Sequence, residues 1–219
     1  MTLIVATPEK IYFDTRVTLK ETLVDGMDDE HQVQLSYDGV CKLMPVGVNT
    51  PESGAIHHTV GFGDVRVFKA INQILRHTGL DVFVDILPSL AKLSGQVTVP
   101  SGLVWVDERG AINSIVREAA AFVHYQYNTD VQAFGHSPEI FNYLYGHGCF
   151  EVEEAFLLAT QECDYCSCGD YYVYDVAQKT YRQIVLDEDE LTSKLTEIKH
   201  KLATALIDNE TNSRELAVG

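Results

Sequence analysis

The stretch "GAIHHTVGFGDVRVFKAINQIL", residues 54–75, changes its hydrophobic period in the middle. Its first half, up to Gly63, is rich in β-formers and ends in glycine punctuation, which predicts a strand. From Asp64 onward apolar residues recur at helical spacing, at Val65, Phe68, Ile71 and Leu75, until "HTG" stops the run. Asp64 is also a residue type that caps helix N-termini. The stretch therefore predicts a strand that leads directly into a helix.

The same patterns along the rest of the chain predict runs of strands separated by runs of helices. Strands are predicted within residues 3–6, 11–13, 33–48, 54–63, 81–87, 96–107, 112–127, 171–176 and 181–186, and helices within 64–77, 136–148, 151–163 and 188–208. Ser137 and Pro138 are expected to open the second helix. This order argues against alternating β-α units and favours a layered α+β architecture with antiparallel sheets. Without a repeat or a long linker, residues 1–219 are predicted to form a single domain, and the tail after residue 208 is expected to fray.

Composition and charge exclude several classes of protein. The formal charge of −16 would repel a phosphate backbone, and no basic stripe is present, so nucleic acids are not expected partners. An odd number of cysteines, no signal segment and no apolar run near 18 residues favour a soluble protein in a reducing, cytoplasmic compartment, not one bound to a membrane. Much of the acidity lies in residues 21–31 and 186–190, which are interpreted as solvated faces or loops.

The segment "QECDYCSCGD", residues 161–170, concentrates three of the five cysteines in a CxxCxC spacing. That spacing invites a metal or redox interpretation, but a fourth ligand at zinc-finger spacing is missing and the histidines form no helical ligand pair. Buried thiols near a turn are the favoured interpretation, and a cysteine-based metal-binding interaction module is the alternative. Phosphate-binding glycine loops are also missing. Taken with the incomplete ligand spacing, this predicts that the protein holds no metal and no cofactor.

Several fragments, taken in order, carry more information together than singly. They are a Thr after the first Met (Thr2), "FDTR" with Asp14 and Arg16, "CKLMPV" with Lys42, "VGFGDVRVFKAI" with Gly61, "FGHSP" with His136, and "DYCSCG" with Asp164 and Ser167. In this order, over about residues 2–185, the chain resembles the β-subunits of the proteasome and the bacterial HslV peptidase, which are N-terminal nucleophile hydrolases. The resemblance implies a four-layer αββα sandwich, two antiparallel sheets between helix layers.

The resemblance also implies a threonine peptidase. A Thr at the chain terminus carries its own base, the α-amine, so its hydroxyl needs no histidine. Removal of Met1 would expose the Thr2 amine, and a nearby cation would lower its pKa from about 8 and raise its neutral fraction. By similarity Lys42 is that cation, held by Asp14. Ser167 and Asp164 would orient the amine, and the N–H of Gly61 would stabilise the oxyanion.

Some positions depart from the family or concern substrate choice. His136 stands where the family carries the Ser of a Gly-Ser-Gly turn, so one of the side chains that share protons in the family's active site is replaced. An acidic insertion at about residues 19–36 and an extra C-terminal helix at about 188–208 are further departures. The resemblance implies a moderately small, apolar pocket for the residue before the cleaved bond, lined by Val17, Val40, Met44, Thr59 and Gly63.

Assembly follows from the resemblance alone. It implies a homo-oligomeric ring, unfolded protein or peptide as substrate and an AAA+ ATPase unfoldase as a partner. Two alternatives to a peptidase within this fold remain open: a catalytically inactive structural or assembly subunit, favoured by His136, and an amidase acting on small molecules.

Overall fold

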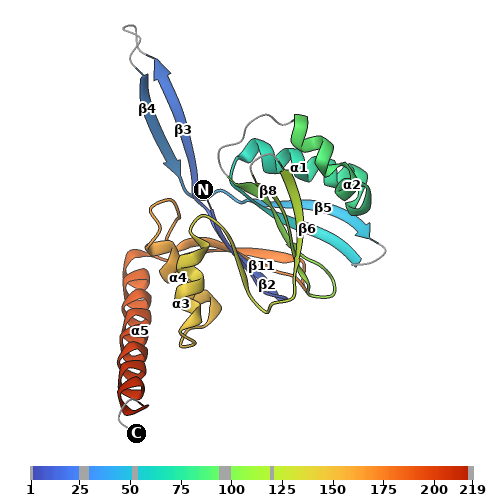
Figure 1. Ribbon diagram of the computed structural model, residues 1–219. Coiled ribbons are helices and arrows are strands. Elements are labelled where there is room, and N and C mark those ends of the chain that lie inside the picture. Colours follow the sequence, from blue (N-terminus) through green and yellow to red (C-terminus); the bar gives the residue numbers. More distant parts are fainter. Residues whose placement is uncertain (1, 25–29, 51–53, 94–99, 119–120, 217–219) are drawn as a thin grey trace.

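A computed structural model describes residues 2–24, 30–50, 54–93, 100–118 and 121–216. Two five-stranded antiparallel sheets lie face to face (Figure 1). The first has the order β10-β1-β2-β11-β12, with β1 Leu3–Ala6, β2 Lys10–Asp14, β10 Gln132–Gly135, β11 Asp170–Asp175 and β12 Thr180–Val185. The second has the order β5-β6-β7-β8-β9, with β5 Leu43–Thr50, β6 Gly54–Phe62, β7 Ser101–Val106, β8 Ile112–Glu118 and β9 Ala121–Tyr127.

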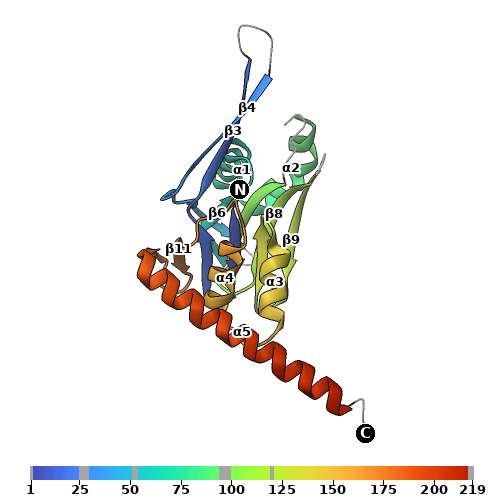
Figure 2. The same ribbon diagram turned by 90° about the vertical axis from the view of Figure 1, so that its left-hand side faces the viewer.

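Helices cover the outer face of each sheet. On the β5–β9 side lie α1 Val65–Thr78 and α2 Leu80–Leu93, and on the other side lie α3 Pro138–Gly146, α4 Val152–Gln161 and α5 Glu188–Leu216 (Figures 1 and 2). None of the described helices is long and apolar enough to cross a bilayer. The predicted α+β fold with two antiparallel sheets between helix layers is confirmed.

Strand β1 shows how the layers are joined. Its four residues are all buried, because successive side chains of a strand point to opposite faces and both faces of this sheet are covered. Leu3 and Val5 pack into the core under α3 and α4, whereas Ile4 and Ala6 pack into the core between the two sheets. This double burial explains why β1 is an unbroken apolar run.

The predicted strand at residues 81–87 is wrong, because that segment lies inside helix α2. The β-branched residues Val82, Val84 and Ile86 alternate and mimic a strand. The residues that are buried, however, are Leu80, Phe83 and Leu87, at spacings of three and four, and they pack on the β5–β9 sheet. Tertiary packing therefore overrides the local β-preference here.

Other boundaries also differ from the sequence predictions. Residues 112–127 form two strands, β8 and β9, paired from Ile112↔Tyr127 to Glu118↔Ala121. The expected acidic insertion falls in a two-stranded hairpin, β3 Val17–Val24 and β4 Glu30–Tyr37, that projects from the sandwich (Figure 1), and residues 25–29 lie outside the described residues. Helix α5 continues to Leu216 where fraying was expected after residue 208. That the whole chain is one domain stays a prediction.

The two predicted helix caps behave differently. Asp64 caps α1 as expected, since its Oδ1 accepts the N–H of Arg66 at 2.8 Å. Ser137 occupies the N-cap position of α3 in a left-handed conformation and makes no side-chain cap bond, so its predicted capping role is wrong. Pro138 does lie in the first turn of α3.

This contrast yields a stability prediction. Asp64→Ala should lower the free energy of unfolding by about 1 kcal/mol, whereas Ser137→Ala should change it by less than about 0.5 kcal/mol. A hydrogen bond from the side chain of Arg66 lowers the pKa of Asp64, so its contribution is full above the ordinary value of 3.8 and is lost as pH falls through the lower folded-state value. Urea denaturation at several pH values measures both effects. Equal losses in the two variants would contradict the assignment of the caps.

Candidate active site

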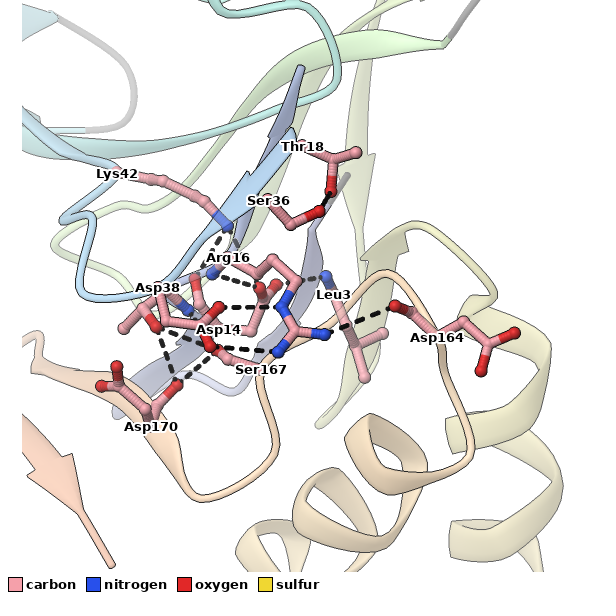
Figure 3. Close-up of polar contacts among 11 residues, drawn as sticks. Leu3, Asp14, Arg16, Thr18, Ser36, Asp38, Lys42, Asp164, Ser167 and Asp170 are labelled. Carbon is pink, nitrogen blue, oxygen red and sulfur yellow. Dashed lines mark hydrogen bonds and ion pairs between the residues drawn. The ribbon is translucent and has the colours of Figure 1, made fainter. Parts of the chain in front are cut away.

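Asp14, the last residue of β2, is completely buried, and its carboxylate is the centre of a polar cluster (Figure 3). Its Oδ2 accepts the backbone N–H of Leu3 at 2.8 Å, and its Oδ1 accepts the backbone N–H of Arg16 at 2.9 Å. The carboxylate thus connects β1 with the turn that follows β2. Because an unpaired buried charge is costly, these bonds fix the side chain in one position.

Lys42 reaches the same carboxylate from the residue before β5. Its Nζ donates to the backbone oxygen of Asp14 at 2.9 Å and lies 3.2 Å from Oδ1, and its side chain is only 3% exposed. The predicted partnership of Asp14 and Lys42 is therefore present as a buried contact between the two sheets.

Burial moves the pKa values of the two groups toward each other. Loss of water raises the pKa of Asp14, against the opposing effects of Lys42 and of the two backbone N–H bonds. Loss of water likewise lowers the pKa of Lys42, against the attraction of Asp14. Opposed shifts of this kind, caused by burial together with a specific charged partner, are common at acid–base sites and also occur in structural ion pairs.

Ser167 joins the turn after α4 to the end of β2. Its Oγ accepts the N–H of Thr15 at 2.9 Å, lies 3.0 Å from Thr15 Oγ1 and donates to the backbone oxygen of Asp170 at 2.6 Å. Ser167 and Thr15 are both buried. Thr15 directly follows Asp14, so its bonds place the serine predicted from "DYCSCG" next to the Asp14 cluster.

The backbone of Thr2 is held beside this cluster from two directions. The N–H of His136 donates to the oxygen of Thr2 at 2.8 Å, and the next residue, Leu3, donates to Asp14. Gly135 allows this approach: it has a φ of 94°, and a Cβ there would lie 1.9 Å from the Thr2 oxygen. Thr2 itself is 4% exposed.

Asp164 and Gly61 do not fit their predicted roles in this geometry. Asp164 is exposed and its carboxylate points away from Asp14 (Figure 3), while its backbone oxygen accepts a bond from Arg16 at 3.4 Å. The N–H of Gly61 donates to the oxygen of Lys42 at 3.1 Å, so it is used within the sheet instead of facing an oxyanion. A Cβ at Gly61 would lie 2.4 Å from the ring of Phe68, so close packing of α1 accounts for this glycine.

His136 takes part through its backbone. Its N–H holds Thr2, and its ring meets the ring of Tyr165 edge to face at a centroid distance of 4.8 Å. Whether the imidazole also shares protons in the site stays a prediction.

The residues predicted to line a substrate pocket lie on different elements. Met44 and Thr59 face each other across β5 and β6, and the hydroxyl of Thr59 donates to Oδ1 of Asn72 on α1 at 2.8 Å. Val17 begins β3, and the N–H of Val40 donates to the oxygen of Thr15 at 3.1 Å. Gly63, with a φ of 79°, packs against Ser101. Their common role in a pocket stays a prediction.

Sequence reasoning missed three polar residues that complete the cluster. Thr15 lies between the recognised Asp14 and Arg16, and Asp170 supplies a backbone acceptor to Ser167. Asp38 pairs with Arg16 at 2.8 and 3.0 Å and ties the base of the β3–β4 hairpin to the site. The Asp-x-Arg motif pointed to the right segment, but only the fold brings Asp38 and Asp170 to it.

The residues that the structure describes contain no group of three His, Cys, Asp or Glu side chains arranged to hold a metal ion. The alternative of a cysteine-based metal module therefore lacks a ligand set within those residues.

The fold has counterparts among solved structures. No family model matches the sequence, and no curated protein matches it. The structure is similar to Anbu (ancestral beta-subunit) from Yersinia bercovieri, with a TM-score of 0.51 and 9% identity over 94% of this chain and 96% of that chain. It is also similar to Anbu from Pseudomonas aeruginosa, with a TM-score of 0.50, 13% identity and the same coverage of both chains.

These similarities correct the family expected from the sequence. The chain shares a proteasome-like fold with Anbu proteins, which are a family distinct from the proteasome β-subunits and HslV, so the expected kinship with the latter two is wrong. Short motifs shared across a fold were sufficient to predict the architecture, but not to choose between families that use it. At 9% and 13% identity the similarity carries the fold alone.

Removing one partner of the buried pair should be worse than removing both. We expect Asp14→Asn or Lys42→Met alone to lower the free energy of unfolding by about 3 kcal/mol, because each leaves an uncompensated buried group, whereas the double variant should recover most of that loss. Lys69→Met, on the exposed face of α1, is the matched control and should change stability by less than about 0.5 kcal/mol. Additive losses in the double-mutant cycle would contradict the coupling.

The same pair predicts a pH dependence. Since the folded-state pKa of Asp14 is raised, its contribution to stability falls as pH rises above the ordinary value of 3.8. Since that of Lys42 is lowered, its contribution rises as pH approaches the ordinary value of 10.5. Relative to the double variant, the wild-type chain should therefore be least stable between these limits, as measured by urea denaturation across pH.

Gly135→Ala should be severely destabilising. The added Cβ would overlap the Thr2 oxygen and the residue would keep a left-handed φ, so we expect a loss of about 3 kcal/mol or more. Gly146→Ala, at the end of α3 where nothing lies within 4 Å of a Cβ, is the control and should be neutral or stabilising by about 0.5 kcal/mol. Thermal unfolding of both variants measures the difference, and similar melting temperatures would contradict the close contact.

Proposed function

We propose that this chain is a subunit of a self-associating assembly and hydrolyses peptide bonds with Thr2 as an N-terminal nucleophile. The observation that carries the proposal is the buried Asp14–Lys42 pair, which is joined to the residue after Thr2 through the Leu3 N–H bond. A threonine whose amine is free can use that amine as its base, and a cation nearby makes the amine more often neutral.

The proposed reaction begins after the chain preceding Thr2 has been removed, because Met1 ties up the amine in a peptide bond. The neutral amine takes the proton of Thr2 Oγ1 as the oxygen attacks the substrate carbonyl. The amine then returns the proton to the leaving nitrogen, and an ester remains on Thr2. Water, deprotonated by the same amine, attacks the ester, and its collapse restores the hydroxyl.

The remaining residues have supporting roles in this proposal. Asp14 holds Lys42 through its carboxylate and its backbone oxygen, and Ser167 with Thr15 fixes the neighbouring turn. Gly61 and the Asp164 carboxylate are left out, because one is engaged in the sheet and the other is exposed. Self-association is supported by the similar Pseudomonas aeruginosa structure, which is a helical assembly of the Anbu complex. An ATPase partner stays a prediction from the sequence.

A catalytically inactive assembly subunit is the second candidate. It is favoured by the engaged N–H of Gly61, since that N–H was the predicted oxyanion donor. The two candidates make the same assembly and differ in whether Thr2 reacts.

The test compares chains that begin at Thr2, produced by cleaving an N-terminal fusion, with chains that keep Met1. We expect hydrolysis of unfolded protein and of fluorogenic peptides only when Thr2 is first, loss of turnover in Thr2→Ala and partial retention in Thr2→Ser, which keeps a hydroxyl. Light scattering reports the assembly of each variant. Equal turnover by Thr2→Ala, or no turnover by an assembled Thr2-first chain, would reject the peptidase and leave the inactive subunit.

A pH profile tests the role of Lys42. Removal of the cation in Lys42→Met should raise the pKa of the Thr2 amine, so the rising limb of kcat/KM should move to higher pH by up to about one unit. Lys69→Met is the control and should leave the profile unchanged. An unshifted limb in Lys42→Met would contradict electrostatic tuning by this residue.

A further inference from the structure

Cys163 and Cys166 close a tight turn directly after helix α4. The N–H of Cys166 donates to the oxygen of Cys163 at 3.1 Å, which is the i to i+3 bond of a β-turn. Such a turn brings the two Cα atoms to within about 7 Å, and a disulfide spans Cα separations of about 4.4–6.8 Å. The backbone of this turn therefore suits a disulfide between its ends.

The two side chains are free thiols that interact with each other, since each shifts the pKa of the other. Both are buried, with Cys163 at 7% and Cys166 at 2% exposure. Cys168, two residues further on, is directed elsewhere, since its Sγ donates to the oxygen of Leu157 in α4 at 3.7 Å. The contact is thus selective for the first two cysteines of the CxxCxC segment.

The two thiols differ in reactivity. The hydrogen bond from Cys166 lowers the pKa of Cys163 to about 7, whereas the same bond and burial raise the pKa of Cys166. Burial also raises the pKa of Cys168. Since the thiolate is the attacking form, Cys163 is the nucleophile of the pair, and it is also the less buried of the two.

We propose that Cys163 and Cys166 are a dithiol site that is oxidised to an intramolecular disulfide by a low-molecular-weight disulfide such as oxidised glutathione. The Cys163 thiolate attacks one sulfur of the oxidant, forms a mixed disulfide and releases one thiolate, which takes up a proton. The Cys166 thiol then loses its proton and attacks Sγ of Cys163, which expels the second glutathione thiolate. The protein loses two electrons and two protons, and the oxidant becomes two thiols.

The site lies against the Asp14 cluster. The Cys166 thiol interacts electrostatically with both Asp14 and Lys42. Ser167, the next residue, holds Thr15. A disulfide would draw the two sulfurs to about 2.05 Å, and the Cys166 thiol beside Asp14 and Lys42 would be lost. Resting on the proposed function, we expect oxidation to slow hydrolysis at Thr2.

The experiment incubates the reduced full chain with mixtures of reduced and oxidised glutathione, quenches with an alkylating agent and maps peptides by mass. We expect a loss of two hydrogens located at Cys163 and Cys166, a fall in free thiols from five to three, and reversal by dithiothreitol. Cys166→Ser should stop at a glutathione adduct on Cys163, whereas Cys163→Ser should leave Cys166 unmodified. Cys41→Ser, which removes an exposed thiol, is the control and should still form the disulfide.

Peptide mapping of the oxidised wild-type chain tests the proposal even if a cysteine variant fails to fold. No change in mass at this pair, a bond that involves Cys168, or a stable adduct confined to Cys41 would overturn it. These outcomes are distinct from failure of the peptidase proposal, because formation of the disulfide is read by mass and needs no turnover. A disulfide that forms without any effect on an active Thr2 would overturn only the coupling to hydrolysis.

Discussion

A carboxylate without access to water sets the geometry at the start of this chain. Asp14 is satisfied by the N–H of Leu3, the N–H of Arg16 and the Nζ of Lys42, which come from β1, the turn after β2 and the residue before β5. Because a buried charge without partners costs several kcal/mol, none of these segments can shift without breaking a bond to it. The position of Thr2 follows from this constraint, since Thr2 precedes Leu3 and is held on its other side by His136.

Thr15 extends the same constraint to the far end of the sequence. Its N–H and hydroxyl meet Ser167, which in turn donates to Asp170 at the start of β11. These hydrogen bonds hold segments that are distant in the sequence together at the end of β2. The Cys163–Cys166 turn adjoins these segments, because it immediately precedes Ser167. The proposed disulfide and the proposed reaction at Thr2 therefore depend on the same hydrogen-bonded segments.

The sequence predicted those parts in which local pattern and fold agree. Strands β1 and β2 and the Asp64 cap follow from β-rich runs and capping chemistry, and the contact of Asp14 with Lys42 follows from the family resemblance. Helix α2 was missed because β-branched residues favour a strand locally, whereas burial of Phe83 decides for a helix. The orientation of Asp164 and the hydrogen bond of the Gly61 N–H could not be predicted from the sequence, since both depend on which neighbouring group forms the hydrogen bond. Motif position fixes where a residue lies along the chain, but not which way its polar group points.

The energetic cost of the Asp14–Lys42 pair is itself an argument for chemistry at this place. A need only to join β1, β2 and β5 would be met by apolar side chains of similar volume, since replacing a buried ion pair by well-packed apolar residues is commonly neutral or stabilising. Apolar packing cannot supply a buried cation bound to the strand end that also holds Leu3, nor an acid and a base in contact. The cost of a buried ion pair therefore favours the proposed role at Thr2 over a purely structural role for Asp14 and Lys42.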